Sequence, residues 1–357
     1  MRYLLIVSLL LLTASASWSV EYRIRDLGTL GGDVGWCEDL NDSGQVVGSS
    51  HTAEGQPRGF VWQEGSPMRD LGTLGGIWSY ALAINHSGSV VGYALTTEGR
   101  NHAFIWQNGS PMEDLGTLGG STSVATGIND DGQAVGYSYV ANGFAHACLW
   151  QDGFMSDLGA LDGESSSASD INESGLVVGQ SSCAEGADHA FLWQEGVGMR
   201  DLGTLGGIYS WATSINGSGQ VAGYSHTLEG WNHAFLWQDD SPIRDLGTLG
   251  GHESYAYAIN DATQVVGYSY LDSDIRHAVL WQNGSCYDLG TLPGAYSSEA
   301  YAINNSGVIV GCCSYGTTWQ PHAVLWEPVP EPSSLLALAG GLGALGLALL
   351  RRRGAKV

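Results

Sequence analysis

Basic residues are the scarcest class in this chain of 357 residues. Lys and Arg together number 13 against 36 Asp and Glu, which gives a formal net charge of −23. Five of the 13 lie in the two end segments, so eight remain between them: the five are Arg2, Arg351, Arg352, Arg353 and Lys356. An acidic surface repels the phosphate backbone of nucleic acid and also anionic polysaccharide. The composition therefore argues against a nucleic-acid partner and suits neutral glycans, divalent cations or simple solubility.

Catalytic and metal-binding motifs are also missing. The sequence has no nucleophile elbow, no H-E-x-x-H and no strand–loop–helix phosphate site. The G-x-G-x-x-G at 341–346 lacks the strand and βαβ unit that a dinucleotide site requires. The six cysteines show neither C-x-x-C nor zinc spacing, although an exported chain permits disulfides whose pairing the sequence does not determine: Cys37, Cys148, Cys183, Cys286, Cys312 and Cys313. We therefore expect no enzyme activity, no cofactor and no metal.

The N-terminal segment 1–16 has the pattern of a secretory signal peptide. Arg2 supplies the positive region, residues 3–12 are apolar, and Ala14-Ser15-Ala16 forms an A-x-A cleavage site. An apolar run this short does not span a bilayer, so a signal peptide is favoured over a membrane anchor.

The C-terminal segment 329–357 has three parts in order. Pro330-Glu331-Pro332 comes first, and the apolar stretch 333–350 would rise about 27 Å as a helix, close to the thickness of about 30 Å of a hydrocarbon core. The basic cluster 351–357, with Arg351, Arg352 and Arg353, follows and favours a cytoplasmic end for this helix.

This tail resembles the PEP-CTERM sorting signal. The resemblance implies processing by an exosortase-type protease in a Gram-negative bacterium that makes exopolysaccharide. It also implies that the helix holds the chain in the inner membrane only until it is removed during sorting to the cell surface or matrix. The alternative is a permanent tail anchor.

Between the ends, residues 17–328 are predicted to form one domain built from seven repeats. The motif DLGTLGG, with degraded copies, begins at intervals of 43 or 44 residues, and its Asp residues are Asp26, Asp70, Asp114, Asp157, Asp201, Asp245 and Asp288. The regular spacing argues for scaffold and against a single active-site loop.

Each repeat contains four strand patterns. In one unit we expect strands at 80–84, 90–95, 102–107 and 113–118, with a hairpin turn at Asn108-Gly109 between the last two. Four short antiparallel strands in about 44 residues have the dimensions of a β-propeller blade.

The incomplete ends of the repeat array predict a closed ring. The first DLGTL precedes the first complete unit, and the last Trp-ending strand has no DLGTL after it. The N-terminal strand 22–30 is therefore expected to complete the seventh blade, which removes the exposed edges. We predict an all-β, seven-bladed β-propeller. An open β-solenoid is the main alternative.

The third strands carry a family resemblance. HAFIW at 102–106, HAFLW at 189–193 and 233–237, and HAVLW at 277–281 and 322–326 resemble the extracellular HAF-repeat family, as do DLGTLGG and the IN-x-x-G-x-VVG pattern. The first copy departs, with Arg58-Gly59 in place of His-Ala. The resemblance implies exported repeats of mostly unassigned activity.

The recurring histidines could be read as a ring of metal ligands, but equivalent positions in seven blades are spread around the ring and do not converge. We expect them to pack within the blades, and the motif Asp to accept hydrogen bonds from a turn or from the histidine. The histidines are His102, His146, His189, His233, His277 and His322.

Aromatic residues in variable loops are the candidate binding site. Connections after the fourth and second strands emerge at one end of each blade, and their rings suit stacking on sugars while nearby acids and amides bond hydroxyl groups. The candidates are Trp36, Trp78, Tyr80, Tyr209, Trp211, Trp231, Tyr255, Tyr296 and Trp319, with Phe144 beside them. About half are also expected to pack between blades.

These patterns predict an interaction module of the cell envelope or exopolysaccharide matrix that binds neutral glycan. A polysaccharide lyase or glycoside hydrolase is one alternative, which carboxylates facing each other across the central channel would favour. A purely structural matrix protein without a ligand is the other.

Overall fold

A computed structural model describes residues 21–329 except 185, 240, 272–274 and 317–319. The signal peptide predicted at 1–16, the sorting residues from Pro330 on and the predicted membrane helix lie outside the described residues. Residues Ile24–Glu327 form one compact unit. In the described part of the chain all regular structure is β-strand, and no helix there is long and apolar enough to cross a membrane.

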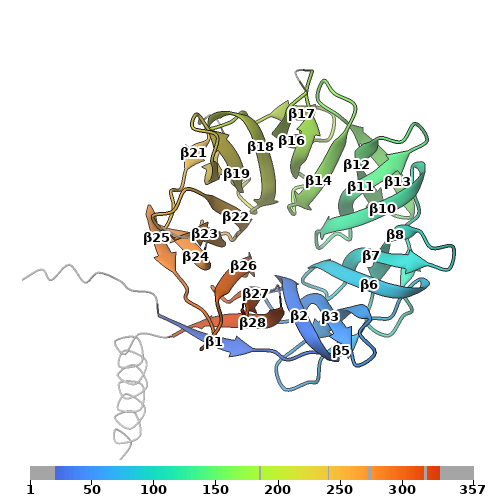
Figure 1. Ribbon diagram of the computed structural model, residues 1–357. Helices are drawn as coiled ribbons and strands as arrows, with labels where there is room; N and C mark the ends of the chain where they lie inside the picture. Colours follow the sequence, from blue (N-terminus) through green and yellow to red (C-terminus); the bar gives the residue numbers. More distant parts are fainter. Residues whose placement is uncertain (1–20, 185, 240, 272–274, 317–319, 330–357) are drawn as a thin grey trace, which may run out of the picture. The chain divides into compact units, whose positions relative to one another are not determined.

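The strands form seven four-stranded antiparallel sheets arranged in a ring, so the protein is a seven-bladed β-propeller (Figure 1). Blade 1 consists of β2 (Gly31–Leu40), β3 (Val46–Thr52), β4 (Pro57–Trp62) and β5 (Arg69–Asp70). Blade 2 consists of β6 (Gly75–Ile84), β7 (Val90–Thr96), β8 (Asn101–Trp106) and β9 (Glu113–Asp114). Blade 3 consists of β10 (Gly119–Ile128), β11 (Ala134–Val140), β12 (Ala145–Gln151) and β13 (Phe154–Gly159). Blade 4 consists of β14 (Ser166–Ile171), β15 (Val177–Ser182), β16 (Asp188–Gln194) and β17 (Gly198–Asp201). Blade 5 consists of β18 (Gly206–Ile215), β19 (Val221–Thr227), β20 (Asn232–Trp237) and β21 (Arg244–Asp245). Blade 6 consists of β22 (Ser254–Ile259), β23 (Val265–Tyr270), β24 (Arg276–Gln282) and β25 (Ser285–Asp288). Blade 7 consists of β26 (Ser297–Ile303), β27 (Ile309–Ser314), β28 (Pro321–Pro328) and β1 (Tyr22–Asp26).

Blade 7 closes the ring with strands from both ends of the domain. Its sheet order is β1-β28-β27-β26, and Leu27 N–H donates to the carbonyl of Ala323 at 2.9 Å. The predicted closure by the N-terminal strand is confirmed, and the open solenoid is excluded.

The DLGTLGG motif proved to be divided between two blades. The predicted fourth strand at 113–118 is wrong in length, because β9 ends at Asp114 and residues 115–118 cross to the next blade. Likewise β1 ends at Asp26 and does not reach residue 30. In blades 1, 2, 3 and 5 the two glycines begin the inner strand, so β6 starts at Gly75, earlier than the predicted residue 80.

Each glycine of the pair has a separate steric reason. Gly75 has a φ of +97°, a conformation that side chains other than glycine rarely adopt. A Cβ on Gly76 would lie 2.4 Å from the carbonyl oxygen of Leu95, which is too close for any side chain. The glycines therefore let the incoming chain turn and then pack tightly on the second strand.

Seven buried asparagines join the blades around the channel. Each donates from Nδ2 to the carbonyl of its counterpart in the next blade at 3.0–3.3 Å, and the last bond returns to the first blade. In each blade the same side chain's oxygen accepts backbone N–H groups of its own turn, as at Asn85. The residues are Asn41, Asn85, Asn129, Asn172, Asn216, Asn260 and Asn304. The IN-x-x-G pattern thus supplies both a turn and a closed ring of hydrogen bonds.

Candidate functional site

The two faces of the propeller are built from different connections. Gly75 pairs with Thr96 and Gly206 pairs with Thr227, so the segments that cross between blades lie beside the loops joining second and third strands. We call this end the crossover face. The asparagine turns and the hairpins between third and fourth strands form the opposite end, which we call the turn face.

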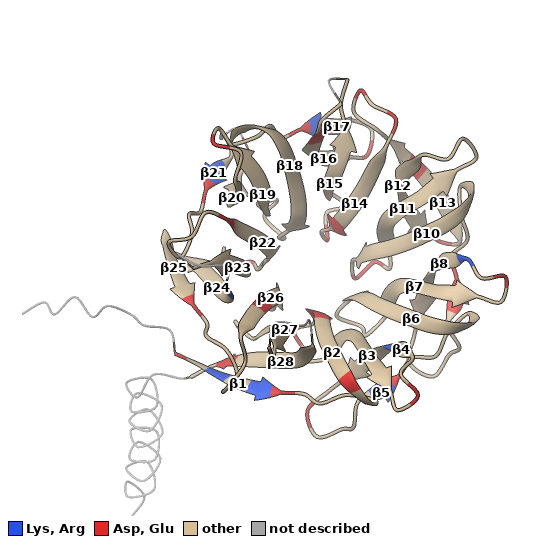
Figure 2. Cartoon of the chain, in the orientation of Figure 1, with Lys and Arg blue, Asp and Glu red and all other residues tan. Residues whose placement is uncertain are grey.

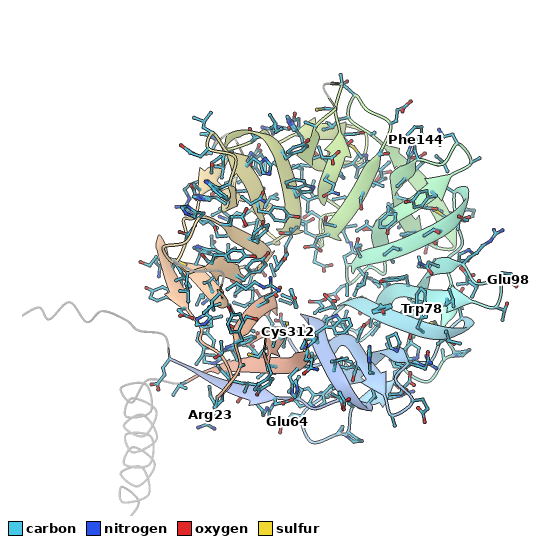
Figure 3. All side chains as sticks on the ribbon, in the orientation of Figure 1. Arg23, Glu64, Trp78, Glu98, Phe144 and Cys312 are labelled. Carbon is cyan, nitrogen blue, oxygen red and sulfur yellow. The ribbon has the colours of Figure 1, made fainter. Side chains whose placement is uncertain are left out.

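The crossover face carries most of the exposed large apolar side chains. In the described residues seven of them belong to its loops or adjoining strand ends: Ile77, Tyr139, Phe144, Ile208, Leu228, Trp231 and Tyr296. Leu228 is 82% exposed and Trp231 is 45% exposed. Figure 3 labels Phe144 and Trp78 among the side chains of this region. Large apolar side chains exposed on one face of a protein are a common feature of interaction surfaces.

The predicted aromatic residues fall into two groups. Trp231 and Tyr296 are exposed, and Trp231 stacks on His252 with ring centroids 4.9 Å apart. The others are half-buried: Trp36, Trp78, Tyr80, Tyr209, Trp211 and Tyr255. Trp319 lies outside the described residues.

The half-buried aromatics pack against one another along the inner strands. Tyr80 stacks on Tyr93 at 5.0 Å, and Trp78 meets both rings edge-on. In blade 5, Trp211 stacks on Tyr209 at 5.6 Å and on Tyr224 at 5.0 Å. The eight candidates that the structure describes are therefore not brought together at one site, and the half-buried rings pack within the blades.

A cavity of about 520 Å³ occupies the central channel. Every inner strand contributes to its lining at the equivalent position: Glu38, Leu82, Thr126, Ser169, Thr213, Tyr257 and Tyr301. Trp36 also lines the cavity, and its Nε1 donates to Glu38 Oε1 at 2.7 Å. The wall is thus polar and aromatic on the side of blades 6, 7 and 1.

Carboxyl groups gather on that side of the channel. Glu299 on β26 is buried, with Oε1 held by Arg276 and Oε2 accepting from the Tyr301 hydroxyl at 2.8 Å. Strands β2 and β26 are neighbours around the channel (Figure 2). Burial, opposed by the hydrogen bond from Trp36 and reinforced by the negative charge of Glu299, raises the pKa of Glu38 to about 7.

Two further carboxyls on inner strands join neighbouring blades. Asp39 accepts the backbone N–H of Ile84 at 2.9 Å, and Asp170 accepts that of Ile215 at 3.0 Å. Burial raises the pKa of Asp39 to about 7 despite these hydrogen bonds. Burial also raises the pKa of Asp170.

Two of these acids depart from the repeat pattern. Glu38 and Glu299 occupy positions that hold Leu, Thr, Ser, Val or aromatic residues in the other blades. Alignment of the repeats on their asparagines reveals both acids, but their proximity depends on the ring bringing blade 7 back to blade 1.

The recurring histidines pair with the motif aspartates. Nδ1 of each lies 2.7–2.9 Å from an Asp Oδ2, and in blade 7 the pair is His322 with Asp26. The other Asp oxygen accepts the N–H of the motif glycine, as in Asp114 with Gly116. In blade 1, Arg58 replaces the histidine and keeps an ion pair with Asp70.

These pairs confirm the predicted packing role. Nowhere in the described chain do three His, Cys, Asp or Glu side chains converge as they would around a metal ion. The six cysteines, all of them described, are free thiols.

Solved structures with similar folds were found, whereas no curated protein matches the sequence. They include the β-propeller domain of the Trilobed protease from Pyrococcus furiosus, with a TM-score of 0.56, 8% identity and coverage of 82% of this chain and 96% of that chain. A puromycin-hydrolyzing peptidase from Mycobacterium tuberculosis gives a TM-score of 0.55, 13% identity and coverage of 86% and 52%. The BP39L lectin from Burkholderia pseudomallei gives a TM-score of 0.50, 6% identity and coverage of 87% and 98%.

At these identities the likeness shows the fold alone, and this chain spans about half of the mycobacterial peptidase. A match to a family model adds information about the C-terminal segment. Residues 328–353 match the PEP-CTERM protein-sorting motif, which is the motif expected from Pro330-Glu331-Pro332 and Arg351-Arg352-Arg353. The chain therefore carries a PEP-CTERM sorting signal, which suggests export and sorting to the cell surface.

Proposed function

We propose that this protein is an interaction module of the cell envelope or exopolysaccharide matrix that binds neutral glycan on its crossover face. The observation that carries the proposal is the collection of exposed aromatic and aliphatic side chains at that face, with Trp231 held in place by His252. A flat ring fixed by a second ring offers a preformed platform for the apolar face of a sugar, at little cost in side-chain entropy.

The sorting motif and the repeat sequences support the cellular setting that we propose. The chain is an HAF-repeat protein of a Gram-negative bacterium, and an exosortase-type protease removes its transient membrane helix. Its acidic surface keeps it soluble among matrix polymers and directs it to uncharged glycans. Binding, and not catalysis, is its role.

One observation favours a polysaccharide hydrolase as the second candidate. Glu38 lines the channel cavity beside Glu299, and its raised pKa suits a general acid. Against this, both oxygens of Glu299 already accept hydrogen bonds from the protein, so this carboxylate is engaged before any substrate arrives.

A neutral-glycan array tests the binding proposal. We expect Trp231→Ala to weaken binding at least about tenfold, because a central aromatic anchor contributes much of the affinity of such a site. Trp231 is a sharper probe than Trp78 or Trp211, whose loss would also disturb the packing of the inner strands.

Phe154→Ala is the matched control, because Phe154 is a 78% exposed aromatic on the turn face. Its glycan binding should equal that of the wild type. An array without any bound neutral glycan would contradict the proposal. Shortened glycan chains in the incubation, abolished by Glu38→Gln, would instead favour the hydrolase.

A further inference from the structure

Three blade interfaces hold an arginine in the same way. The arginine precedes the motif aspartate on an outer strand, and its Cζ lies 5.0–5.3 Å from the ring centroid of the tryptophan that ends the third strand of the next blade. The pairs are Arg25 with Trp62, Arg69 with Trp106, and Arg200 with Trp237. A guanidinium over an indole ring is a favourable cation–π contact.

A polar side chain two residues after each tryptophan receives the same guanidinium. Arg69 Nη1 donates to Asn108 Oδ1 at 2.7 Å, Arg200 Nη1 donates to Asp239 Oδ1 at 2.8 Å, and Arg25 forms an ion pair with Glu64. The repeat thus contains a built arginine site, made of a tryptophan from the third strand and an acceptor from the hairpin that follows it.

The interface between blades 2 and 3 has this site without its arginine. Trp150 and the acceptor position Asp152 are in place, but Glu113 occupies the position of the arginine. A cavity of about 320 Å³ lies there, lined by Glu113, Trp150, Asp152 and Phe154 among others, and none of its lining residues is basic. Figure 2 shows basic segments on β1, β17 and β21, whereas β9 consists of the two acids Glu113 and Asp114.

The rim of this cavity is accessible. Phe154 is 78% exposed at the rim, whereas Trp150 is 4% exposed, so only a small part of this ring faces the cavity. Asp152 and Gly153 form a tight hairpin in which Gln151 pairs with Phe154. This hairpin belongs to a repeat in which 43 residues separate Asp114 from Asp157, one fewer than the 44 between Asp70 and Asp114.

We propose that the cavity between blades 2 and 3 binds an arginine side chain of a partner protein. The guanidinium would pair with the carboxylates of Asp152 and Glu113 beside the small accessible part of Trp150, and the arginine stem would cover Phe154. Carboxylates match the planar donor geometry of arginine, and the net charge of −23 attracts a cationic partner. The contact of Arg69 with Trp106 and Asn108, one blade earlier, is the internal model for this binding.

The corresponding cavity between blades 5 and 6 differs from the one between blades 2 and 3 because its lining includes an arginine. It has a volume of about 410 Å³ and is lined by Trp281 and Asn283, the counterparts of Trp150 and Asp152. Arg244 of this chain, the counterpart of Glu113, also lines it. That cavity carries its own positive charge and is not expected to accept a second arginine.

Calorimetric titration of the purified full-length protein with the acetylated and amidated peptide Gly-Gly-Arg-Gly-Gly tests the proposal. We expect measurable binding that weakens as salt is raised, because the contact is between exposed charges. The same peptide with citrulline, which has the shape of arginine without its charge, should bind at least about tenfold more weakly.

Glu113→Arg is the decisive variant. It restores the arginine present in the preceding blade, so it should fill the cavity, abolish peptide binding and leave the melting temperature unchanged or higher. Asp152→Asn and Phe154→Ala should each weaken peptide binding without filling the cavity, which keeps the test valid if Glu113→Arg misfolds. Trp231→Ala, which probes the glycan surface, should bind the peptide like the wild type.

Three results would overturn the proposal: no binding of the arginine peptide to the wild type, equal binding of the citrulline peptide, or full binding by a correctly folded Glu113→Arg protein. None of these concerns the glycan array, so the failure of one proposal is distinguishable from the failure of the other.

Discussion

At the scale of single residues, the aspartate of DLGTLGG explains the strictness of the motif. One oxygen accepts the backbone N–H of the glycine two positions later, and the other meets the recurring histidine. Arg58 shows that the requirement is for a cationic or hydrogen-bonding partner of the carboxylate, since it keeps the contact with Asp70 where the histidine is absent.

The channel carboxyls predict that stability falls as the pH rises. Burial raises the pKa values of Glu38 and Asp39 to about 7 in the folded protein, against about 4 in an unfolded chain. Between these values the folded state holds protons that the unfolded state has released, so stability is full below about pH 4 and is lost as the pH rises through 7.

Melting temperatures should be measured from about pH 4.5 to about pH 8, a range that spans the folded-state pKa of Glu38 and of Asp39. Over this range we expect the melting temperature to decline less steeply for Asp39→Asn than for the wild type. The amide oxygen of the substituted side chain can still accept the N–H of Ile84, so this contact is retained. Asp130→Asn, at an exposed position on the turn face, serves as the control and should keep the wild-type slope. An Asp39→Asn slope equal to that of the wild type would contradict the assignment.

At the scale of the strand, the glycine pair decides how closely the inner strand packs on its neighbour. Gly76 lies against the carbonyl of Leu95, whereas Gly109 in the exposed hairpin has open space around the site of a Cβ. Substitution of Gly76 therefore measures the cost of a steric clash, and substitution of Gly109 measures the cost of a positive φ.

We expect Gly76→Ala to lower the free energy of unfolding by about 3 kcal/mol, because the strand must move away from Leu95. Gly109→Ala has only its φ of +89° to accommodate and should cost about 1–2 kcal/mol. Chemical denaturation of the two variants measures the difference. Equal losses would mean that close approach does not set the inner strand's position.

At the scale of the whole ring, closure depends on a contact between residues that are far apart in sequence. The bond from Leu27 to Ala323 and the pair of Asp26 with His322 attach β1 to β28. The asparagine ring closes through Asn304 and Asn41. Without β1, the edge of β28 would be exposed and open to pairing with another chain.

A protein that lacks residues 17–27 should therefore melt at a lower temperature and aggregate, as measured by thermal denaturation and light scattering. A synthetic peptide of residues 20–30 added in trans should restore part of the melting temperature by occupying the vacant edge. A shortened protein as stable as the intact chain would show that the closing strand is dispensable.

The sequence by itself determined the number of blades, the strand order and the exchange at the closing blade, because seven copies of one pattern with complementary incomplete ends permit little else. It also determined the sorting motif, which is read as a linear signal. It misplaced the start of the inner strand β6, since Gly75 and Gly76 look like a turn until their contacts with the neighbouring strand are known.

Only the tertiary structure decided which aromatic rings are exposed, as for Trp231, and which are packed, as for Trp211. It alone placed Glu38 beside Glu299, and Glu113 across a cavity from Trp150. These groups come from different blades, so their distances are set by ring closure and blade packing. The sequence of a single repeat therefore contains no information about the position of Glu38 relative to Glu299, or of Glu113 relative to Trp150.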